Sequence, residues 1–265
     1  MSRVFLSSGG GAMKNQLIGR VRGRLALPAL LALLHAGGVA APQGQAAGAG
    51  AAGPRYTLRL SAERAAPPPR LSGSLQFSGE RGVLIRYQGL TIFSDPAALP
   101  EPPPAVDLVV LSHFHPGHIE RLARQNLARA TPIVCTGQSA LALRALGFRN
   151  LYIMETWDAI HVNKGAARLR LTALPGRAGA ALLPAGTMDA MLDIGDGKGA
   201  AYRIYLSGDS MQRGDSAAIP RRLPGADLAL LHPDGGRLLG VETAADGVIN
   251  YLRRDEVYPF KARKR

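Results

Sequence analysis

The chain has 265 residues, of which 46% are apolar and 5% aromatic, so Leu, Ala and Val can fill a core and a wholly disordered chain is excluded. The formal net charge is +13, but basic residues form a run only at the C-terminal end, so we expect no nucleic-acid partner. The single cysteine, Cys135, excludes an internal disulfide.

Residues 1–46 have the order of an export signal followed by a spacer. Basic residues without acidic ones come first, an apolar run at residues 25–34 follows, and small residues then dominate. The apolar run is shorter than the roughly 20 residues that span a bilayer. We therefore predict export to a bacterial-type periplasm, a mature chain that begins near residues 41–47, and no stable membrane span after signal removal. An uncleaved N-terminal anchor is the alternative.

Residues 47–70 are rich in Ala and Pro, which predicts a flexible connector. Residues 71–265 then form a single domain, because about 190 residues is an ordinary size for one domain.

Apolar patterning predicts strands at residues 83–87, 90–93, 107–112, 132–135, 151–154, 168–174, 202–206 and 227–231. Gln88-Gly89 turns the first two into a hairpin. The strands at 107–112 and 227–231 are apolar throughout and are expected to be buried on both faces, whereas 168–174 alternates and is expected to have one wet face. Helical spacing predicts helices at 119–128 and 139–146. This mixture favours an α/β or α+β layered domain.

Three histidines follow the strand at 107–112 directly. His113 and His115 point the same way on an extended segment, and Pro116-Gly117 turns the chain so that His118 can fold back toward them. Imidazole nitrogens suit zinc, iron or manganese, so the cluster predicts a metal site. A polar loop at the end of a strand is the alternative.

The segment from Ser112 to His118 resembles the His-x-His-x-Asp-His signature of the metallo-β-lactamase superfamily. Ser207-Gly208-Asp209-Ser210 is similar to that superfamily's Gly-Asp-Thr/Ser element, whose Asp bridges two metals. The segments 84–96 and 174–177 resemble parts of the branch that includes ascorbate-6-phosphate lactonase and N-acyl phosphatidylethanolamine phospholipase D. The likeness covers about residues 75–260. It implies a four-layer αββα sandwich with the site at one edge of its two sheets.

Three expected ligands of that superfamily are replaced. Gly117 stands where the signature has Asp, Ala178 where it has the next His, and Lys261 near its last His. The remaining ligands are His113, His115, His118 and Asp209. Because two ions need more donors, we expect one ion, zinc or another divalent metal such as manganese or iron.

His232 and Asp234 follow the buried strand at 227–231 and are candidates for a substitute or substrate-binding role. His161 alternates with apolar neighbours and is expected on a strand surface.

The resemblance implies a metal-dependent hydrolase in which a metal-bound water, oriented by Asp209, attacks an ester, lactone or phosphodiester. We expect its substrate to be a small or lipid-like molecule. The alternative is a non-catalytic descendant that acts as a binding protein, because Gly117, Ala178 and Lys261 replace expected ligands.

Overall fold

A computed structural model describes residues 53–62, 72–96, 105–124, 127–176, 186–195, 200–208, 223, 225–232, 237–245 and 249–261. The expected export signal and the Pro-rich part of the connector lie outside these residues. Within the described part of the chain, no helix combines the length and apolarity needed to cross a membrane.

Seven strands form one mixed sheet in the order β15-β2-β3-β4-β5-β6-β7. Their bounds are β2 Ser72–Gly79, β3 Gly82–Tyr87, β4 Leu90–Ser94, β5 Leu108–Val110, β6 Ile133–Cys135, β7 Leu151–Ile153 and β15 Val257–Lys261. The predicted hairpin is β3 and β4. From β4 to β7 the neighbouring strands are parallel, so their carboxyl ends meet at one edge of the sheet.

Eight strands form the second sheet in the order β1-β8-β9-β10-β11-β12-β13-β14. Their bounds are β1 Tyr56–Leu60, β8 Ala159–Lys164, β9 Ala167–Pro175, β10 Met188–Gly195, β11 Ala200–Leu206, β12 Leu228–Leu231, β13 Leu239–Thr243 and β14 Ile249–Leu252. Strands β11 and β12 are parallel, and they repeat the relation between β4 and β5 in the other sheet.

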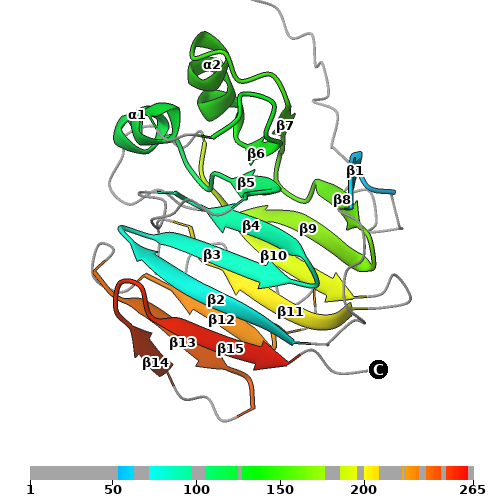
Figure 1. The fold of residues 1–265 in the computed structure, drawn as a ribbon, viewed down its shortest axis with the longest axis vertical. Coiled ribbons are helices and arrows are strands. Elements are labelled where there is room, and N and C mark those ends of the chain that lie inside the picture. The colour runs from blue at the N-terminus through cyan, green and yellow to red at the C-terminus, as the bar shows by residue number, and fades with distance from the viewer. Residues whose placement is uncertain are drawn as a thin grey trace, which may run out of the picture. The chain divides into compact units, whose positions relative to one another are not determined.

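The inner faces of the two sheets share one apolar core. Leu75, Phe77 and Ile85 of the seven-stranded sheet belong to the same buried cluster as Leu171 and Leu192 of the eight-stranded sheet, and all five are fully buried. Figure 1 shows β2 to β4 lying over β9 to β12. Burial of this apolar surface is the main force that holds the sheets together.

Two helices cover the outer face of the seven-stranded sheet, beside β5 to β7 (Figure 1). They are α1, Pro116–Arg124, and α2, Gly137–Ala145. The Oγ1 of Thr136 caps α2 by accepting a hydrogen bond from Ser139 N. The predicted sandwich class is confirmed. Among the described residues, both helices lie on this one sheet.

Several elements differ from the sequence-based expectations. Strands β2, β10, β13, β14 and β15 were not predicted, and β12, which was expected to be buried on both faces, has half-buried side chains at Ala229 and Leu231. Tyr56–Leu60, within the expected connector, forms β1 and pairs in parallel with β8, because its alternating pattern gives an edge strand. Strand β9 is buried on both faces from Leu171 to Leu174, since Trp157 and Tyr205 pack against Leu174 on the face that was expected to be wet.

The packing of α2 gives a matched test of the apolar cluster between the helices and the seven-stranded sheet. Leu143 is fully buried, whereas Leu141 on the same helix is 69% exposed. We expect Leu143→Ala to lower the free energy of unfolding by about 2–5 kcal/mol, because it leaves a cavity. Leu141→Ala should change it by less than about 0.5 kcal/mol. Urea denaturation measures both, and equal losses would contradict the packing of α2.

Candidate metal centre

The carboxyl ends of β4 and β5 bring Asp95 and His113 together. Asp95 follows β4 immediately, and Ser112-His113 come soon after β5, its parallel neighbour. Asp95 N donates a hydrogen bond to Val110 O at 2.8 Å, which fixes where the chain leaves the sheet.

Ser112 joins this edge to the other sheet. Its backbone N donates to Asp95 Oδ1 at 2.8 Å, and its backbone O accepts from Met188 N of β10 at 2.7 Å. The next residue, His113, forms an isolated bridge with Thr187. The site therefore lies where the two sheets meet.

The histidine cluster contains two buried rings and one exposed ring. His113 and His118 are each 6% exposed, and their ligand nitrogens lie with an Asp95 carboxylate oxygen all within 4.8 Å of one another. His115 is exposed, with its ring centroid 4.7 Å from that of His118 and 6.2 Å from that of His113. Among the described residues, this trio of Asp95, His113 and His118 is the group whose spacing suits one ion.

His118 reaches the cluster because α1 begins earlier than predicted. Pro116 is well suited to a first helical turn, since its fixed φ is already helical and its missing N–H costs nothing there. His118 N and Ile119 N both donate to His115 O, at 3.0 and 3.1 Å, which places His118 in that first turn. Its ring then points inward from the helix.

Burial controls the charge of these rings. Desolvation lowers the pKa of His118 to about 4, against the opposing effect of the Asp95 carboxylate. Desolvation also lowers the pKa of His113, whose Nδ1 lies 2.8 Å from Ser112 Oγ. Both rings are therefore neutral at pH 7, which is the form that binds metal ions.

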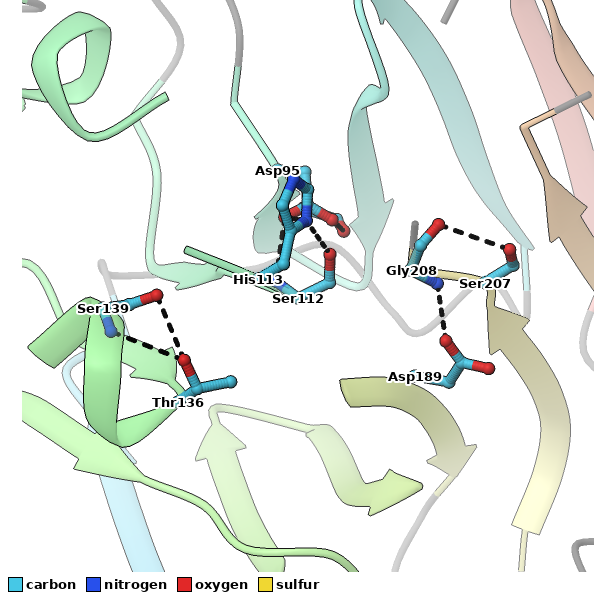
Figure 2. A network of polar contacts seen from close by, with 9 residues as sticks. Asp95, Ser112, His113, Thr136, Ser139, Asp189, Ser207 and Gly208 are labelled. Carbon is cyan, nitrogen blue, oxygen red and sulfur yellow. Dashed lines mark hydrogen bonds and ion pairs between the residues drawn. The ribbon is translucent and has the colours of Figure 1, made fainter. Parts of the chain in front are cut away.

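Asp189 and Gly208 form the opposite wall of the site, on the eight-stranded sheet. Gly208 N donates to Asp189 Oδ1 at 2.8 Å, and Tyr205 OH donates to Asp189 Oδ2. Desolvation raises the pKa of Asp189, and these two hydrogen bonds oppose that change. Figure 2 shows Ser112 between this pair and the Asp95–His113 pair.

His232 lies close to the same edge. It follows β12, and desolvation lowers its pKa to about 4, with further lowering by the charges of Arg81 and His113. Its Nδ1 is buried and has no hydrogen-bond partner among the described residues. The structure thus brings His232 near His113, but not into the trio of ligand atoms.

The structure does not place the other predicted site residues in the cluster. Asp209, Asp234 and Ala178 lie outside the described residues. Lys261 needs a correction. It is exposed on edge strand β15, where it pairs with Ser72 at the start of β2. It therefore does not stand in a ligand position.

Sequence reasoning missed Asp95 as a site residue. Its signal was present, because a carboxylate directly after one strand and histidines directly after the next parallel strand must meet at one edge. From the sequence alone, Ser94-Asp95-Pro96 indicated only the end of a strand.

Comparison with known families identifies this arrangement. The family described as "Beta-lactamase superfamily domain" matches residues 80–237, which contain Asp95, the histidine cluster and His232. The chain belongs to this superfamily. A search of curated proteins found no match.

Solved structures of this fold are similar to the chain at low identity. Isothiocyanate hydrolase from Delia radicum gut bacteria is 18% identical over 59% of this chain and 70% of that chain, with a TM-score of 0.47. CmlA, a diiron β-hydroxylase from Streptomyces venezuelae, is 17% identical over 62% of this chain and 34% of that chain, with a TM-score of 0.46. Igni18, a metallo hydrolase from Ignicoccus hospitalis, is 18% identical over 57% of this chain and 66% of that chain, with a TM-score of 0.42.

The close approach at Gly208 can be tested with a matched glycine. A Cβ at Gly208 would lie 2.9 Å from Met188 O and 3.1 Å from Asp189 Oδ1, whereas a Cβ at Gly225 would meet nothing within 4 Å. We expect Gly208→Ala to lower stability by about 1–3 kcal/mol and to weaken metal binding, because the turn must move away from Met188 and Asp189. Gly225→Ala should change neither. Thermal unfolding with a zinc titration measures both effects, and a neutral Gly208→Ala would show that the turn is not packed against this wall.

Proposed function

We propose that the chain is a metal-dependent hydrolase with one divalent ion at the edge where the two sheets meet. His113, His118 and Asp95 would hold the ion, with His115 and Asp209 as further donors. The observation that carries this proposal is the buried trio, whose ligand atoms all lie within 4.8 Å of one another. Zinc is the ion that best suits imidazole with carboxylate, and manganese or iron are the alternatives.

The described residues suit such an ion. His118 Nδ1 is buried without a hydrogen-bond partner in the described part of the chain, and a buried polar atom of this kind is costly unless something binds it. His113 Nδ1 and Ser112 Oγ share a hydrogen bond. In the tautomer in which Nδ1 is the donor, Nε2 is the nitrogen that can bind an ion. When bound, a divalent ion supplies a nucleophile at neutral pH by lowering the pKa of water to about 7.

The protein's own residues would position the reacting groups. Asp95 holds Ser112 and thereby fixes where His113 begins. Asp189 holds Gly208, the last described residue before Asp209, at this edge. In this proposal the Asp209 carboxylate orients the attacking water. His232, with its lowered pKa, is neutral there and is available to bind the substrate.

An ester, lactone or phosphodiester of a small or lipid-like molecule is the proposed substrate. This follows the resemblance of segments 84–96 and 174–177 to the branch of ascorbate-6-phosphate lactonase and N-acyl phosphatidylethanolamine phospholipase D. The order of residues 1–46 supports export to the periplasm. Gly117 supports the second candidate function, a binding protein that has lost catalysis.

Metal content separates the two candidates. We expect the purified chain to keep about one equivalent of zinc, manganese or iron after desalting, because buried neutral histidines bind such ions tightly. His113→Ala should release the ion. His161 is half-buried on β8, away from the predicted ligands, so His161→Ala should retain the ion. Elemental analysis by mass spectrometry measures both. Less than roughly a tenth of an equivalent in the unaltered chain would exclude the hydrolase.

A further inference from the structure

A buried carboxylate holds the end of β11 beyond its sheet pairing. The last pair between β10 and β11 at this end is Ala190 with Leu206, so the ladder does not reach Gly208. Gly208 N instead donates to Asp189 Oδ1 at 2.8 Å, and Asp189 is 5% exposed. A carboxylate at such depth is costly unless hydrogen bonds satisfy it. The place of Gly208 therefore depends on this one side chain and on what else binds it.

Tyr205 satisfies the other oxygen of the same carboxylate. Its hydroxyl donates to Asp189 Oδ2, and its ring packs with Leu174 and Met191. Tyr205 pairs with Met191 in register, so Asp189 lies on the same face of the sheet as its diagonal neighbour, which an aromatic side chain can reach. Burial raises the pKa of the Tyr205 phenol, and the charge of Asp189 raises it further. The phenol therefore stays protonated and donates.

Gly208 lies against Ser112, which belongs to the edge of the other sheet. A Cβ at Gly208 would lie 2.9 Å from Met188 O and 3.4 Å from Ser112 Cβ, so the two backbones approach closely. Ser112 Oγ in turn lies 2.8 Å from His113 Nδ1. A continuous series of buried contacts thus leads from Asp189 through Gly208 and Ser112 to the ring of His113 (Figure 2).

We propose that Tyr205 and Asp189 are positioning residues, which act through Gly208 and the Ser112 hydroxyl on the ring of His113. The contact with Gly208 restricts how the Ser112 side chain can rotate, and Ser112 Oγ then orients the imidazole. The second hydrogen bond of a metal-ligating histidine controls how well that ring binds its ion. The expected effect on metal affinity rests on the proposed function, whereas the expected effect on the His113 ring does not.

Zinc affinity of the full chain tests this series of contacts with two tyrosines of one strand. We expect Tyr205→Phe to weaken zinc binding about threefold or more, because Asp189 Oδ2 loses its donor and Gly208 is held less firmly. Tyr202→Phe should change it less than about twofold. The ring of Tyr202 stacks on Phe260 at 5.0 Å between centroids, in the core between the sheets. Competition titration with a chromophoric chelator measures both, and equal effects would overturn the proposal.

A double-mutant cycle shows whether the effect passes through the Ser112 hydroxyl. Ser112→Ala alone should weaken zinc binding about tenfold or more, since it removes the partner of His113 Nδ1. Adding Tyr205→Phe to Ser112→Ala should weaken it less than about twofold further, although the melting temperature should still fall. A Tyr205 that is merely structural would reduce zinc affinity by the same factor in both backgrounds, which would contradict the proposal.

A conservative variant of the carboxylate separates the hydrogen bond to Gly208 from the volume of the side chain. Asp189→Asn should retain more zinc affinity than Asp189→Ala, because the amide oxygen can still accept from Gly208 N. Equal losses of affinity in the two variants would show that Asp189 does not act through Gly208.

Nitrogen NMR of the imidazole rings gives a test that needs no metal. In the metal-free full chain, Tyr205→Phe should shift the ring nitrogen resonances of His113, assigned with His113→Gln. It should leave those of His161 on β8 unchanged. Unshifted His113 resonances would overturn the proposal whether or not zinc binds. Absence of zinc from the unaltered chain would instead contradict the hydrolase, and the NMR result would then decide the role of Tyr205 and Asp189.

Discussion

The backbone of Ser112 is the constraint on which the site depends. Its N–H is held by Asp95 of one sheet edge and its carbonyl by Met188 of the other sheet. Both contacts are buried, where a hydrogen bond is expensive to lose. Because His113 comes next, its ring has little freedom, and α1 then starts at Pro116 and returns His118 to the same place. The geometry of the proposed metal site is thus a consequence of how the two sheets are joined.

A repeated unit explains why functional groups collect at this edge. In β4 and β5, Asp107 Oδ2 accepts from Thr91 N at 2.8 Å; in β11 and β12, Asp227 Oδ2 accepts from Arg203 N at 2.8 Å. Both pairs are parallel, so each delivers loops to the same edge of its sheet. By register, His232 corresponds to Ser112. This correspondence explains why His232 lies near His113.

Much of the fold could be predicted from sequence because its strands are short apolar runs separated by Gly and Pro. The hairpin of β3 and β4, the buried β5 and helix α2 follow from such local patterns. Strands β1 and β15 could not be found in this way, since their weak patterns become strands by pairing with distant segments, β1 with β8 and β15 with β2. For the site, the histidine spacing was sufficient to find His113 and His118. Asp95 was missed because it comes from a different segment, and its place beside the histidines depends on the parallel pairing of β4 with β5.

Gly117 leaves the position next to His115 without a carboxylate, and a Cβ there would lie 3.5 Å from Arg121 Nη2. The proposed site therefore has buried donors for one ion, from Asp95, His113 and His118.

X-ray absorption spectroscopy at the zinc edge tests this central claim most directly. For the zinc-loaded chain, the account predicts a shell of nitrogen and oxygen ligands at about 2.0–2.1 Å with the outer scattering of at least two imidazoles. It also predicts no zinc neighbour at about 3.5–4 Å. Sulfur ligands at about 2.3 Å, a spectrum without imidazole scattering, or a clear zinc–zinc distance would contradict a single ion held by the histidine cluster.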